Sequence, residues 1–150
     1  MDRLNHVKIA TPDPEAVERF LREVVDIPAG WPLGTPPEPP AEPVRSPASD
    51  ASGNFTAESV MEFRGPGPFS GFIAGSTESR QFQILQCDRA HVWGVAIGTR
   101  NLERAHERCL ERGIPCTEPA KRGWGDGTIE YFFAEVGGIV FEVMRIGQAG

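Results

Sequence analysis

The amino-acid sequence predicts an α+β fold made of two β-α-β-β-β modules, whose mixed sheet curls as a half-barrel around a cavity. Two observations lead to this prediction. The pair His6-Val7 opens one stretch of strand pattern, the pair His91-Val92 opens another, and a helical pattern follows each. Each half then closes on a short apolar strand with one polar residue inside it, Phe82-Gln83-Ile84-Leu85 and Phe141-Glu142-Val143-Met144. Such a repeat indicates one structural unit used twice.

The first module is expected to begin with a strand and a capped helix. Residues 4–10 alternate, which places Val7 on one side of the strand and both His6 and Lys8 on the other. Asp13 caps the helix and Pro14 suits its first turn. The helix is expected to end near residue 26 and to bury one stripe of residues, Val17, Phe20, Leu21, Val24 and Val25. The last two strands of this module are expected at residues 58–64 and 81–86.

A proline-rich segment interrupts the first module. Eight of the fourteen prolines lie between Pro28 and Pro47, in a mixture of Pro, Glu, Ala and Ser. Such a composition does not fill a sheet, because proline removes ladder donors and the segment has little apolar surface to bury. We therefore predict an insertion over about residues 33–54, either a lid over the site or a surface loop.

The second module repeats the plan without an insertion. A strand is predicted over 91–97, followed by a helix that ends at Gly113, and three further strands are expected at 115–118, 128–135 and 139–144. His91 follows His6 by 85 positions, and the run Leu102-Glu103-Arg104 follows Val17-Glu18-Arg19 by the same number. We therefore expect a single domain over residues 1–150, with module one at 1–88 and module two at 89–147.

Composition excludes several classes of function. The net charge is −6 and the basic residues form no run, so a nucleic-acid partner is not expected. No apolar stretch is long enough for a membrane span or a secretory signal, which makes a cytoplasmic protein the expectation. The three cysteines are odd in number and contain no Cys-x-x-Cys pair, so neither a disulfide framework nor a thiolate zinc site is expected.

Strand alternation gathers four side chains that suit a metal ion. The apolar residues of the strands must face the helices, and this leaves the other face to His6, Gln83, His91 and Glu142. Imidazole nitrogens with amide and carboxylate oxygens suit Co²⁺, Mn²⁺, Ni²⁺, Fe²⁺ or Zn²⁺, with coordination positions left open. Glu62 falls on the same face by the same count. His106, among charged residues of the second helix, is expected to be solvated.

These residues resemble the vicinal oxygen chelate superfamily, the group of lactoylglutathione lyase, methylmalonyl-CoA epimerase, extradiol dioxygenases and the bleomycin resistance proteins. The resemblance covers the chain except the proline-rich insertion. It implies paired β-α-β-β-β modules with metal ligands on the first and last strands of each, where His6, Gln83, His91 and Glu142 stand. The order His, Gln, His, Glu is similar to that of methylmalonyl-CoA epimerase, and Val60-Met61-Glu62-Phe63 resembles a run in that enzyme which carries an acid.

The resemblance implies a metal-dependent isomerase or epimerase. The metal would stabilise the enolate formed beside a carbonyl, with Glu62 as base and Glu142, or water near it, as the proton donor on the other face. One alternative is an Fe(II) extradiol-type dioxygenase that uses His6, His91 and Glu142. Another is a metal-free protein that only binds a small molecule. In each case the partner is a small molecule, such as a thioester or ketone for the isomerase, and the family suggests a homodimer.

Overall fold

A computed structural model describes residues 2–27, 29–30, 49, 51–64, 71–75, 80–124 and 127–147 of the 150-residue chain. The chain divides into two compact units. The first unit consists of residues 5–46 and 67–93, and the second of residues 1–4, 47–66 and 94–150. In each unit the described strands combine parallel and antiparallel pairing, with one parallel pair in each.

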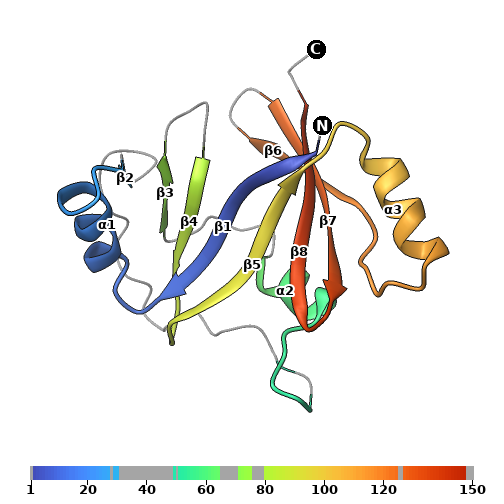
Figure 1. Ribbon diagram of the computed structural model, residues 1–150, viewed down its shortest axis with the longest axis horizontal. Helices are drawn as coiled ribbons and strands as arrows, with labels where there is room; N and C mark the ends of the chain where they lie inside the picture. Colours follow the sequence, from blue (N-terminus) through green and yellow to red (C-terminus); the bar gives the residue numbers. More distant parts are fainter. Residues whose placement is uncertain are drawn as a thin grey trace. The chain divides into compact units, whose positions relative to one another are not determined.

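The first unit contains β1 (Arg3–Thr11), α1 (Pro14–Glu23), β2 (Ala29–Gly30), β3 (Gly71–Gly75) and β4 (Arg80–Gln86), in the strand order β2-β3-β4-β1 (Figure 1). β1 runs parallel to β4, whereas β2, β3 and β4 are antiparallel neighbours. α1 begins at the Asp13 cap, whose carboxylate accepts a hydrogen bond from the backbone N–H of Ala16. It packs through Leu21 on Ile84, with Ile9, Val17, Ile27 and Phe82 around them.

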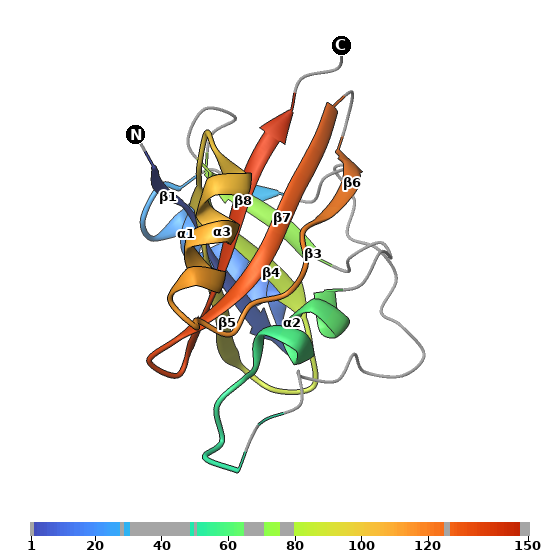
Figure 2. The same cartoon turned by 90° about the vertical axis from the view of Figure 1, so that its right-hand side faces the viewer.

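The second unit contains α2 (Ala57–Arg64), β5 (His91–Gly98) from Gly94 onward, α3 (Leu102–Glu111), β6 (Ala120–Trp124), β7 (Gly127–Val136) and β8 (Ile139–Gly147). The strand order is β5-β8-β7-β6, with β5 parallel to β8 and the other pairs antiparallel. Figure 2 shows α3 beside β7 and β8. Leu102 of α3 packs there on Phe132 and Ala134 in the core.

The α+β class and the mixed strand arrangement are confirmed. The strands expected at 4–10, 81–86, 91–97, 128–135 and 139–144 form β1, β4, β5, β7 and β8, and the two long helices form in the expected segments. Of the proline-rich insertion, residues 33–48 and Asp50 lie outside the described residues. The division into modules at residue 88 stays a prediction.

The strand expected at 58–64 is wrong, because this segment is the helix α2. A reciprocal cap starts it: the backbone N–H of Ser59 donates to the hydroxyl of Thr56, and the backbone N–H of Thr56 donates to the hydroxyl of Ser59. Ala57 and Val60, three residues apart on one side of the helix, are fully buried. Glu62 therefore lies on an exposed part of a helix and not on a strand.

Three smaller expectations are also wrong. The strand placed at 115–118 is only an isolated bridge between Cys116 and Ala134, and the strand itself is β6, which begins at Ala120. α1 ends at Glu23, three residues early, and three residues of the expected buried stripe, Phe20, Val24 and Val25, are 52%, 67% and 43% exposed. His106 is buried against the edge of the Phe132 ring, instead of solvated.

Candidate functional site

A polar face lies on β1 and β4 of the first unit, opposite the face that packs on α1. His6, Lys8 and Gln83 are only 7%, 1% and 8% exposed. The parallel pairing of the two strands sets Lys8 directly beside Gln83. Strand alternation therefore produces, as predicted, a buried row of polar side chains on this face.

Lys8 is the residue of this face that sequence reasoning placed correctly but gave no role. Its Nζ donates a hydrogen bond of 2.9 Å to Oε1 of Gln83, and it lies 4.5 Å from the centre of the Trp93 ring. The signal was present in the sequence, because a lysine two residues from His6 on a strand shares its face. A lysine is almost never fully buried unless it has partners.

Glu142 lies on β8 of the second unit and is 3% exposed. Its register partners are Ala96 on β5 and Phe133 on β7. Tyr131, two residues before Phe133, faces the same side and is also buried. Burial raises the pKa of Tyr131, a shift that Arg122 opposes and the nearby carboxylate of Glu142 reinforces. Glu142 and Tyr131 thus form a buried acidic and phenolic pair on one face.

His91 sits at the start of β5 with a thiol beside its ring. Sγ of Cys87 lies 3.8 Å from Nε2 of His91, and Cys87 is buried. Burial lowers the pKa of His91, the positive charge of Arg89 lowers it further, and Asp88 opposes the shift. A neutral ring next to a thiol is the state that these surroundings favour.

The repeat has a different register from the one expected. In both halves a threonine hydroxyl accepts a hydrogen bond from the backbone N–H of the helix cap, Thr11 for Asp13 and Thr99 for Asn101. These caps are 88 positions apart, as are the helix starts at Pro14 and Leu102. The strand pairings agree, since Val7 pairs with Phe82 as Val95 pairs with Phe141. The expected spacing of 85 is therefore wrong.

The corrected register changes the residue that corresponds to His6. A spacing of 88 positions places Gly94 there, and His91 lies three residues earlier in the strand. Glycine offers no side chain to a metal ion. Gln83 and Glu142 do correspond, because one pairs with Lys8 and the other with Ala96 at equivalent steps of the two parallel ladders.

The metal set His6, Gln83, His91 and Glu142 stays a prediction. Within the part of the chain that the structure describes, no three His, Cys, Asp or Glu side chains form a group that could hold a metal ion. The amide oxygen of Gln83, which a metal would need, accepts its hydrogen bond from the ammonium of Lys8. An ammonium and a divalent cation compete for the same oxygen, so both do not occupy it at once.

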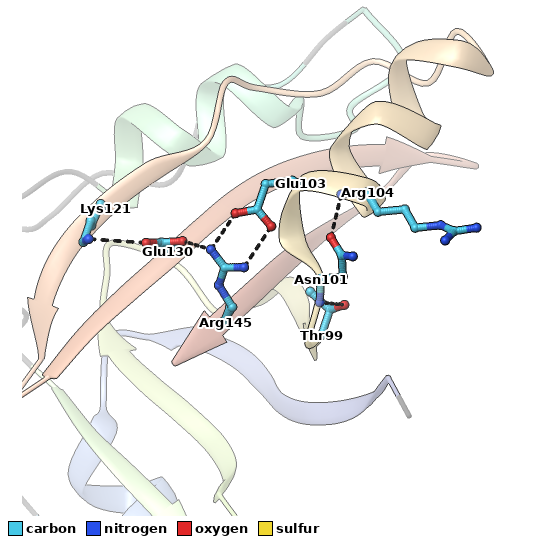
Figure 3. Close-up of polar contacts among 7 residues, drawn as sticks. All are labelled: Thr99, Asn101, Glu103, Arg104, Lys121, Glu130 and Arg145. Atoms are coloured by element: carbon cyan, nitrogen blue, oxygen red, sulfur yellow. Dashed lines mark hydrogen bonds and ion pairs between the residues drawn. The ribbon is translucent and has the colours of Figure 1, made fainter. Parts of the chain in front are cut away.

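An ion-pair network on the second unit holds α3 to the sheet (Figure 3). Arg145 of β8 donates to both carboxylate oxygens of Glu103 on α3 and to Glu130 on β7, which also pairs with Lys121 on β6. The hydrogen bond from Arg145 lowers the pKa of Glu103 and of Glu130, and the two carboxylates raise the pKa of Arg145. This network links α3 and β6 to the neighbouring strands β7 and β8.

Comparison with known proteins gives the family. A family profile described as the glyoxalase/bleomycin resistance protein/dioxygenase superfamily matches residues 3–143. The chain belongs to this superfamily. A search of curated proteins gives no match.

Solved structures of the superfamily share the fold. Methylmalonyl-CoA epimerase from Mycobacterium tuberculosis is 12% identical, with a TM-score of 0.57 over 95% of this chain and 86% of its own. A Mn(II)-bound glyoxalase from Novosphingobium aromaticivorans is 18% identical, with a TM-score of 0.54 over 100% of this chain and 42% of its own. A mutant of 4-hydroxymandelate synthase from Streptomyces coelicolor is 11% identical, with a TM-score of 0.62 over 99% of this chain and 49% of its own.

Identities this low establish the fold and leave the reaction open. These similar proteins include an epimerase, a glyoxalase and a synthase. Among the described residues, no helix is long and apolar enough to cross a membrane. The catalytic roles of Glu62 and Glu142 and the homodimer stay predictions.

Proposed function

We propose that this chain binds a small organic molecule through the polar sheet faces of the fold, and that it does so without a divalent metal ion. The observation that carries this proposal is Gly94, which stands where the repeat requires the counterpart of His6. One nitrogen ligand is missing from the expected set, and the oxygen of Gln83 is engaged by Lys8. A carbonyl or carboxylate compound suits the polar groups that remain.

A metal-dependent isomerase is the second candidate. His6, Gln83 and Glu142 are all buried and all retain side chains that bind metals, which favours it. In that case they would hold the ion, and the ion would supply electrostatic stabilisation of an enolate. Glu142 and the exposed Glu62 would move the proton. The extradiol dioxygenase has less support, since it requires His91, which contacts Cys87.

Metal analysis separates the two candidates. The protein is purified without added metal, and its content of Mn, Fe, Co, Ni and Zn is measured by mass spectrometry before and after incubation with Co²⁺ and gel filtration. The proposal expects far less than one equivalent in both samples. One equivalent that is retained, and that His6→Ala and Gln83→Ala each remove, would overturn it and support the isomerase.

Binding is tested on the same metal-free sample. Thermal unfolding is followed in the presence of small 2-oxo acids, ketones and dicarboxylates, because a ligand that binds only the folded chain raises its melting temperature. The proposal expects at least one of these classes to raise it equally with and without EDTA. Ligand shifts that vanish with EDTA would count against it.

A further inference from the structure

Lys8 is the most unusual group in the first unit. Its side chain is 1% exposed, yet a charged ammonium taken out of water costs several kcal/mol unless other groups replace its hydration. Lys8 also stands in the middle of β1, where its neighbours on the same face are His6 and Ala10.

The surroundings of Lys8 are those of a cation site. An amide oxygen at 2.9 Å and the face of an indole ring at 4.5 Å are two groups that attract positive charge. The amide belongs to Gln83, the residue whose oxygen a divalent ion would need. At the equivalent step of the second unit, the residue opposite Glu142 is Ala96, which carries no charge. At this step of the two parallel ladders, Lys8 therefore has no charged counterpart in the second unit.

We propose that Lys8 is the built-in cation of this site, and that its ammonium excludes a divalent metal from the oxygen of Gln83. This inference rests on the proposed metal-independent function and names the residue that determines it. The ammonium contributes one positive charge and hydrogen-bond donors in place of a Lewis acid. The site then carries its positive charge without metal loading, and chelators leave it unchanged.

Removal of the ammonium tests the inference. Lys8→Met keeps the length of the side chain and removes its charge, whereas Lys121→Met is the matched control at the other lysine of the chain, which is exposed on β6. Co²⁺ binding is followed by its visible absorption and by calorimetry. Lys8→Met is expected to bind Co²⁺ at least about tenfold more tightly than wild type, and Gln83→Ala in the same background is expected to reverse this gain. Lys121→Met is expected to behave as wild type.

Each outcome has one meaning. If folded Lys8→Met binds Co²⁺ no better than a metal-free wild type, the inference is overturned and the proposed function stands. If wild type itself binds Co²⁺ through His6 and Gln83, the proposed function fails, and the exclusion by Lys8 fails with it. Circular dichroism and cooperative melting establish that the variants fold.

A second measurement covers the case in which Lys8→Met does not fold. Lysine ammonium protons of wild type and Lys121→Met are recorded by ¹H–¹⁵N NMR at neutral pH, where exposed ammonium groups exchange too fast to be seen. A buried, hydrogen-bonded Lys8 is expected to give one cross-peak that survives Lys121→Met and shifts in Gln83→Leu. The lack of any such peak in Lys121→Met would overturn the inference.

Discussion

The hydrogen bond between Lys8 and Gln83 predicts a measurable loss of stability when its acceptor is removed. Gln83→Leu keeps the size of the side chain and leaves the buried ammonium without that oxygen. A hydrogen bond to a charged group contributes about 1.5–3 kcal/mol, and the buried leucine offsets part of that, so we expect a loss of about 2 kcal/mol. For a chain of this size the melting temperature should fall by about 4–8 °C.

The control for this prediction lies three residues along the same strand. Gln86 is half-buried, and its side chain makes no hydrogen bond to the described residues. Gln86→Leu should therefore change stability by less than about 0.5 kcal/mol. Urea unfolding followed by tryptophan fluorescence, with and without EDTA, measures both variants. Equal stabilities of the two variants would refute the reasoning, and a loss of wild-type stability in EDTA would indicate a bound metal instead.

Three further predictions concern the packing and the charges of the second unit. Arg145 lowers the pKa of two carboxylates in the folded chain. The stability that it provides is therefore present at pH values above the unfolded pKa, near 4.5, and is lost as the pH falls through the lower folded pKa. The melting temperature of Arg145→Met should be lower than that of wild type at pH 7 and approach it at pH 3. Burial raises the pKa of the thiols of Cys109 and Cys116, and iodoacetamide at pH 8 should alkylate them more slowly in the folded than in the unfolded chain, as mass spectrometry would show; equal rates contradict this. Phe132→Ala should lower the free energy of unfolding, measured in urea, by about 3–5 kcal/mol, and Phe20→Ala should lower it much less, because Phe132 is fully buried and Phe20 is not. Similar losses for the two variants would contradict the assignment of the core.

Elements with a strong periodic pattern could be predicted from the sequence. β1 and β4 alternate cleanly, and their polar face was assigned correctly because the period of a strand leaves no choice once Ile9 and Ile84 face the helix. α1 was found through its Asp13 cap, and α3 through the helical pattern that ends at Gly113. Their exposed apolar residues, such as Phe20, were not recognised, since a helical stripe does not reveal how much of its width a sheet covers.

The segment at 58–64 shows where a short apolar pattern misleads. Val60 and Glu62 alternate in strand fashion, but Ala57 and Val60 also fit one side of a helix. The deciding feature stood just outside the segment, in the pair Thr56 and Ser59, whose hydroxyls close the first turn. Glu62 was assigned to the polar face of a strand, but the segment is a helix. Strand alternation therefore no longer supports a role for Glu62 as a base.

The register of the repeat is the point on which the functional interpretation turns. Similar letters, Val17-Glu18-Arg19 and Leu102-Glu103-Arg104, suggested a spacing of 85, whereas the hydroxyls of Thr11 and Thr99 fix a spacing of 88. A cap determines the phase of the strand before it and the helix after it, but charged residues on a helix surface tolerate any phase. With a spacing of 85 the two histidines would be equivalent. With a spacing of 88, three residues more, Gly94 takes the place of one of them and offers no ligand. The caps, both visible in the sequence as Thr-x-Asp and Thr-x-Asn, are the better guide to which residues of a duplicated fold correspond.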